Sequence, residues 1–210
     1  MQTRQRITRA AQDVFRELGY AGTTNKTVAD RAGLTRPTIN DHFESKQALF
    51  RCVIDANAEV VEATTTRLTA QESTLRGRLR ELTTAMCADP DVRAATASLM
   101  AAAIDCDRHP ELRPVRGDFF SGLRSFLVSS VLAAVECGDV RADVEASSLA
   151  DAYLAVLSGM ALGGGGTRGD SRSLALAETS LLLLTGEVFS YPAGAVSWTD
   201  EPTNPPGGIT

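Results

Sequence analysis

Apolar side chains recur every three or four residues along most of the chain, which is the spacing of amphipathic helices. The first such stripe runs through Ile7, Ala10, Ala11, Val14, Phe15 and Leu18, and it ends at Gly19. No long stretch alternates apolar and polar residues as a half-buried strand would. The pattern therefore predicts an all-α protein.

A short helix is expected directly before Gly33. Its small apolar face is formed by Val28, Ala29 and Ala32. Gly33 should end this helix, because glycine readily adopts the left-handed conformation that is common just past a helix end.

A second short helix is expected to follow at once. Thr35 can cap it, and Pro37 stands in its first turn, where a missing backbone N–H costs little. The helix should run from about Arg36 to Phe43 and be about 12 Å long, which matches the width of a DNA major groove. The two helices and their turn predict a helix-turn-helix.

The remaining apolar stripes predict a larger helical unit. A long helix should start at Ser45 and carry Leu49, Val53, Ile54, Val60 and Val61. Further helices are expected at about 75–86, 92–104, 119–135, 146–162 and 174–191. Proline, glycine and acidic residues dominate after Tyr191, so residues 192–210 are predicted to be disordered.

We therefore divide the chain into a head (residues 1–46), a body (residues 47–191) and a tail (residues 192–210). The chain has 210 residues, which is enough for the head and the body each to have a core of its own.

The charge is distributed unevenly between these parts. The whole chain has a net charge of -5, but residues 1–51 contain nine Lys and Arg against five acids. A basic head on an acidic body directs a polyanion to one end of the molecule, and phosphate neutralisation supplies most non-specific DNA affinity.

The ordered signals of the first 50 residues resemble the DNA-binding domain of the TetR family of transcriptional regulators. The matching positions are Ile7, Ala10, Ala11, Phe15, Gly19, Tyr20, Thr24, Ala32 to Thr35, Thr38, Ile39, His42, Phe43, Ser45, Lys46 and Leu49. Two positions depart from the family pattern. Asn25 replaces an apolar residue, and Asn40 replaces a tyrosine that contacts a phosphate.

The helix-turn-helix and the resemblance together predict the DNA contacts. They assign them to Arg4, Lys26, Thr35, Arg36, Pro37, Thr38, Asn40, His42 and Lys46. Lys46 should contact phosphate, and Arg4 and Arg6 would reach the DNA backbone from a polar arm, Met1 to Arg6. A disordered, solubilising arm is the alternative.

The last two helices are apolar around much of their circumference. The resemblance implies that they pair with a second copy in a four-helix bundle. The interface is assigned to Leu157, Leu174, Leu181, Leu184 and Val188. The alternative is that the rest of the body covers these faces.

The resemblance also implies a small-molecule effector bound in the body. Adaptable and aromatic side chains suit an apolar or aromatic ligand. The candidates are Met86, Met100, Phe119, Phe120 and Tyr153. The family most often represses, so we expect a repressor that leaves a pseudo-palindromic operator when an inducer binds.

An enzyme or an adaptor is the alternative class. No nucleophile with a neighbouring base, paired acids or metal-ligand spacing is evident, and the glycine run 163–166 lacks the GK[ST] of a phosphate loop. The four cysteines form no CxxC pair, and we interpret them as small apolar residues, with a redox sensor as the alternative. We expect no metal, no cofactor, no membrane partner and a soluble, cytoplasmic protein.

Overall fold

The computed structural model describes residues 2–69, 74–115, 120–163, 175 and 178–183, and every regular element within them is helical. This confirms the all-α prediction. The elements are α1 (Gln2–Gly22), α2 (Asn25–Ala32), α3 (Arg36–His42), α4 (Lys46–Thr69), α5 (Leu75–Ala88), α6 (Pro90–Arg108), the 3₁₀ turn η1 (Pro110–Leu112), α7 (Ser121–Glu136) and α8 (Ala146–Gly163). Residues 178–183 are also helical.

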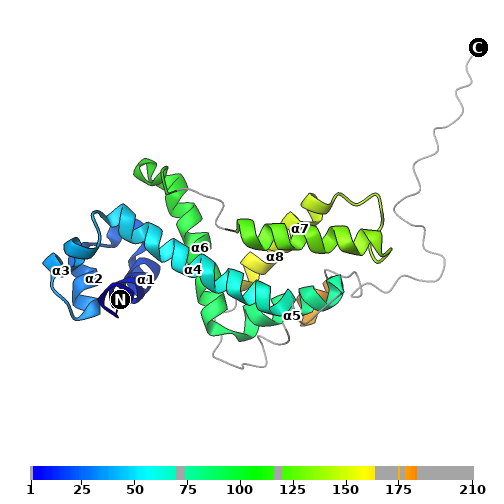
Figure 1. The fold of residues 1–210 in the computed structure, drawn as a ribbon, viewed down its shortest axis with the longest axis horizontal. Coiled ribbons are helices and arrows are strands. Elements are labelled where there is room, and N and C mark those ends of the chain that lie inside the picture. Colours follow the sequence, from blue (N-terminus) through cyan, green and yellow to red (C-terminus); the bar gives the residue numbers. More distant parts are fainter. Residues whose placement is uncertain (1, 70–73, 116–119, 164–174, 176–177, 184–210) are drawn as a thin grey trace, which may run out of the picture.

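The helices form an elongated molecule with the helix-turn-helix at one end (Figure 1). Helices α1, α2 and α3 make a compact group, and α4 runs out of this group along the body. Helix α6 crosses α4, and α5, α7 and α8 lie at the other end. Helix α4 therefore contributes to both the head and the body.

Local capping sets where these helices begin. Ser45 Oγ accepts a hydrogen bond from the Ala48 amide at 3.1 Å, so α4 starts where the sequence predicts. Asp89 ends α5 and caps α6, its carboxylate accepting from the amides of Asp91 and Val92. Helix α6 is longer than the predicted 92–104, because Pro90 fits its first turn and it continues to Arg108, just before Pro110.

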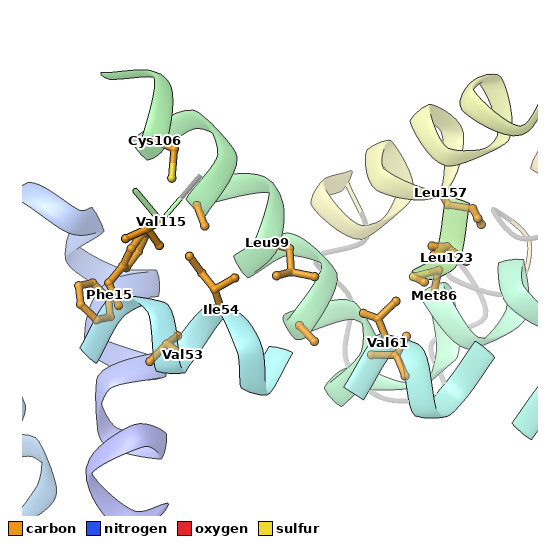
Figure 2. Packing of buried hydrophobic residues seen from close by; sticks show 14 of the residues in the cluster. Phe15, Val53, Ile54, Val61, Met86, Leu99, Cys106, Val115, Leu123 and Leu157 are labelled. Carbon is orange, nitrogen blue, oxygen red and sulfur yellow. The ribbon is translucent and has the colours of Figure 1, made fainter. Parts of the chain in front are cut away.

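The separate cores that we predicted for the head and the body are wrong. The buried apolar side chains form one cluster that includes Ile7 in the head and Met160 in α8. Figure 2 shows its middle part, where Phe15 and Val53 lie on the head side, Ile54 and Leu99 lie between α4 and α6, and Val61, Met86, Leu123 and Leu157 continue into the body. The head is thus packed against the body through apolar contacts along α4 and α6.

The predicted polar arm is also wrong. Helix α1 begins at Gln2, since no glycine or proline interrupts the first residues, and Arg4 and Arg6 bind other parts of the head. At the other end of α1, Leu18 is 50 % exposed although it was predicted in the buried stripe. The chain leaves helical geometry at Gly19 (φ 66°, ψ 179°), and Tyr20 fills the core in its place.

Several predictions lie outside the described residues. These are the disordered tail 192–210, most of the helix 174–191, and the individual residues Phe119, Leu174, Leu184 and Val188.

The turn between α2 and α3 depends on the left-handed conformation of Gly33 (φ 61°). A Cβ added at Gly33 would lie 2.9 Å from Arg6 Nη2. We expect Gly33→Ala to lower the free energy of unfolding by roughly 1–2 kcal/mol, because an L side chain is strained there. Urea unfolding at one fixed protein concentration measures this effect.

Gly122→Ala is the matched control. Its φ is ordinary, its Cβ would lie 3.7 Å from Glu62, and alanine favours a helix over glycine by up to about 1 kcal/mol. Equal midpoints for Gly33→Ala and the wild type would contradict the proposed strain.

Candidate nucleic-acid interface

Helices α2 and α3 are each fixed by side-chain caps. Thr24 and Thr27 form a capping box, in which Thr24 Oγ1 accepts from the Thr27 amide at 3.1 Å and Thr27 Oγ1 accepts from the Thr24 amide at 3.0 Å. Thr35 caps α3, and its hydroxyl lies 2.8 Å from that of Thr38. The predicted helix-turn-helix therefore has the local bonds that its sequence indicates.

Helix α3 buries one side and exposes the other. Ile39 is 0 % exposed, and Phe43, one turn later, is also buried. Burial of one such side chain contributes roughly 1.5–3 kcal/mol, which helps hold a seven-residue helix that would be marginal in isolation. The exposed side chains of α3 are Arg36, Pro37, Asn40, Asp41 and His42, while Thr38 is half-buried.

Two arginines of α1 support the helix-turn-helix from behind. Arg6 donates to the carbonyls of Ala32 (2.7 Å) and Gly33 (3.0 Å), which end α2. Arg4 donates to the carbonyl of His42 at 3.1 Å, and its guanidinium lies 4.4 Å from the centre of the Phe43 ring. Both charges thereby stabilise helix ends with unpaired carbonyls, as cations do at helix C-termini.

Lys46 lies at the junction of head and body. Its Nζ is 4.2 Å from the centre of the Tyr20 ring and 3.5 Å from the Ala21 carbonyl oxygen. Burial lowers the pKa of its ammonium group, and the nearby carboxylates of Glu111 and Asp105 act in the opposite direction. The Lys46 ammonium group, for which the sequence predicts a phosphate contact, thus contacts other groups of the protein. Lys26, by contrast, is exposed.

Sequence reasoning missed a contact between the two departures from the family pattern. Asn25 Nδ2 donates to Asn40 Oδ1 at 2.8 Å, linking the start of α2 to the last turn of α3. The two departures were visible in the sequence, but their pairing depends on the angle between the helices.

Two cavities in the described part of the chain adjoin α4. The larger, about 930 Å³, is an open groove between α1 and α4, lined mostly by polar and charged side chains such as Arg9, Asp13 and Glu59. The smaller, about 240 Å³, lies between α4 and the start of α7. It is lined by Arg51, Ile54, Asp55, Ala58, Val61, Glu62, Phe120, Ser121, Gly122 and Leu123.

The predicted effector residues occupy different environments. Phe120 lines the smaller cavity, Met86 and Tyr153 are buried in the core, and Met100 on α6 is half-buried. Of the predicted dimer residues, Leu157 is only 1 % exposed, so it packs inside its own protomer and leaves no surface for a second copy. Leu181 is half-buried.

Within the described part of the chain, no group of three or more His, Cys, Asp or Glu side chains could hold a metal ion. Nor does any helix there have the length and apolar character to cross a membrane. Of the cysteines, Cys87 and Cys106 are buried, Cys52 is half-buried and Cys137 is exposed.

A capped helix pair whose outer side carries arginine, amide and hydroxyl groups, mounted on a helical body, defines a DNA-binding regulator of the helix-turn-helix class. Residues 7–53 match the family model described as bacterial regulatory proteins, tetR family, and this match extends past the head into α4. This match confirms the resemblance to the TetR family that the sequence predicts for the head.

Solved structures have the same overall fold. A TetR-family regulator from Cytophaga hutchinsonii is 24 % identical, with a TM-score of 0.71, over 88 % of this chain and 94 % of that one. Salmonella enterica GusR is 29 % identical, with a TM-score of 0.70 and the same shares covered. FadR from Bacillus subtilis, in complex with stearoyl-CoA, is 17 % identical, with a TM-score of 0.65, over 86 % of this chain and 96 % of that one.

We expect Arg36→Ala to weaken binding to the preferred operator by about 1–3 kcal/mol and to relax the preference at one base pair, as for an arginine that contacts guanine.

Lys26→Ala should instead weaken all duplexes alike and reduce the salt slope by about one, as for a phosphate contact. Fluorescence anisotropy on operator and scrambled duplexes at several salt concentrations distinguishes the two effects.

Arg80→Ala is the control for Arg36→Ala, because it removes the same charge from an exposed position on α5 in the body. If Arg80→Ala reduced operator affinity as much as Arg36→Ala, the effect would come from net charge and not from the α3 contact.

Proposed function

We propose that this protein is a ligand-responsive transcriptional repressor that binds a pseudo-palindromic operator as a homodimer. The observation that carries this proposal is the exposed side of α3, which presents Arg36 and Asn40 while Ile39 anchors the helix from behind. A two-fold dimer would place two such helices in successive major grooves, about 34–36 Å apart.

Apolar surface near the C-terminal end of the described chain supports the dimer. Leu162 at the end of α8 is 58 % exposed, and Leu182 and Leu183 are 40 % and 53 % exposed. Large apolar side chains that are exposed to water in the monomer can be covered by a second copy. We assign the dimer contact to this surface and to the predicted residues Leu174, Leu181, Leu184 and Val188.

The junction between head and body supports ligand control. The Tyr20 amide donates to Asp105 Oδ2 at 3.0 Å, and the Tyr20 ring lies 5.3 Å from that of His109, centre to centre. Asp105 lies in the last turn of α6, and His109 directly follows this helix. A shift of α6 would therefore be transmitted directly to the end of α1, in addition to any tilt of α4.

The cavity between α4 and α7 is our candidate effector site. Ile54, Val61 and Phe120 provide apolar walls, and Arg51 and Glu62 provide charges for a polar group. An effector with a mainly apolar or aromatic body and one polar group fits this lining. The likeness to FadR, whose structure contains stearoyl-CoA, supports an effector that is at least partly apolar.

The effector changes DNA affinity only to the extent that it binds one arrangement of head and body better than the other. Coupling of this kind is typically worth about 1–3 kcal/mol and is reciprocal, so operator DNA should weaken effector binding by the same factor.

Light scattering and a gel shift test the core of the proposal. At micromolar concentration the mass should be near twice 22.3 kDa, and the protein should shift a two-fold symmetric duplex selected from the DNA that flanks its own gene. A strict monomer, or equal binding to scrambled duplexes, would contradict it.

Gly122→Leu tests the effector site. The side chain should extend into the cavity between α4 and α7, so a metabolite that raises the melting temperature of the wild type should no longer do so. Saturation at 100 times Kd stabilises by about 2.7 kcal/mol, which gives a shift of a few degrees. Operator affinity should stay unchanged, because Gly122 lies outside the head.

Gly122→Ala is the control for this experiment, since its Cβ makes only ordinary contact with Glu62 and should leave the metabolite response intact. An equal shift in the wild type and in Gly122→Leu would place the effector elsewhere.

A further inference from the structure

Asn25 and Asn40 form a side-chain pair at the surface of the helix-turn-helix. The 2.8 Å hydrogen bond from Asn25 Nδ2 to Asn40 Oδ1 joins the start of α2 to the last turn of α3. Asn40 is exposed and Asn25 is half-buried. In the described part of the chain, this is the one hydrogen bond made by either side-chain amide.

Asn40 lies on the side of α3 that faces away from the core. Arg36 and Asn40 are four residues apart and therefore share one face of the helix, whereas Ile39 and Phe43 share the buried face. The two exposed residues are separated by about 6 Å along the helix axis, close to the rise of two base pairs in B-DNA.

The pair contributes little to folding. A hydrogen bond between neutral groups has a small net value, because both groups bond to water in the unfolded chain. The bond instead fixes the orientation of the Asn40 amide before DNA binds. Ordering a side chain in advance reduces the cost of binding.

We propose that Asn25 and Asn40 act as one unit that recognises an adenine in each operator half-site, about two base pairs from the base contacted by Arg36. This inference rests on the proposed function. Asn25 sets the orientation of the amide, and Asn40 makes the base contact.

The chemistry of the oriented amide favours adenine. Asn25 occupies one lone pair of Asn40 Oδ1, and the carbonyl oxygen has a second one free to accept from adenine N6. Asn40 Nδ2 then donates to adenine N7, which completes the bidentate pairing of asparagine with adenine in the major groove. A phosphate would accept only the Nδ2 donor and would give no base preference.

Selection from a library of random duplexes tests the proposal, using the full-length wild type and three variants. Asn40→Ala removes the amide, and Asn25→Val leaves Asn40 in place but removes its partner. Asn25→Asp replaces the donor by an acceptor, so the Asn40 amide should turn and present its oxygen outward. Urea unfolding of each variant checks that the fold is retained.

We expect the wild type to enrich a two-fold symmetric site with adenine at one position of each half-site. Asn40→Ala should reduce the preference for that adenine by about five- to a hundredfold and leave the other positions unchanged. Asn25→Val should reduce the same preference without changing the unfolding midpoint. Asn25→Asp should shift the preference toward cytosine, whose N4 amino group is a donor.

The outcomes separate the two levels of the proposal. If the wild type enriches no duplex, the proposed function fails and the adenine contact fails with it. If the wild type enriches a site but Asn25→Val retains its base preference, the pairing is overturned while the regulator function stands. A uniform loss of affinity in Asn40→Ala, with a lower salt slope and the same preferred bases, would make Asn40 a phosphate contact and also overturn the proposal.

Discussion

The position of the head depends on how Tyr20 is held. Its ring packs with Phe15 and Phe50 at centre-to-centre distances of 6.3 and 5.1 Å, and its amide is bonded to Asp105 of α6. Gly19 makes this possible, because its positive φ lets the chain turn Tyr20 inward at the end of α1. Tyr20 thus contacts the head, α4 and the end of α6 at the same time. None of these elements can move relative to the others without breaking a contact of Tyr20.

The same arrangement shows how one continuous core could serve the proposed function, in which the head binds DNA and the body binds an effector. A flexible linker between two separate cores would let the head adopt any orientation, and binding in the body would have no effect on it. Apolar packing along α4 and α6 allows only a few arrangements, because close-packed interiors do not deform continuously. In the proposed regulator, an effector that favours one arrangement would therefore change the position of the helix-turn-helix.

Short-range signals made much of the fold predictable. Gly33, Thr35 and Pro37 determine the conformation of their immediate neighbours. The spacing of apolar residues predicted that the segments between such signals are α-helices. The failures involve contacts between distant residues. Nothing near Arg4 or Arg6 in the sequence indicates that they bond to carbonyls at the ends of α3 and α2. Leu18 fits the apolar stripe but is exposed, because the chain turns at Gly19 and Tyr20 fills the core in its place.

The candidate site was predictable to the level of the element and less so to the level of the side chain. The sequence assigned the candidate interface to α3 because a capped helix after a glycine turn is typical of this motif. It did not show that Lys46 is held against Tyr20, since that contact requires the end of α1 to fold back over the start of α4. The pairing of Asn25 with Asn40 likewise depends on the crossing of two helices.

The support of α3 from behind has an evolutionary consequence. Ile39 and Phe43 anchor the helix, and Arg4 bonds to its last carbonyl, so its outward positions carry little of the folding energy. Mutations at Arg36 or Asn40 should then be nearly neutral for stability while they alter the DNA sequence that is bound. If the proposed function holds, duplicated copies of such a gene could acquire new target sites through single substitutions and keep the same effector response. The scaffold of the proposed regulator would then separate what it senses from where on the chromosome it acts.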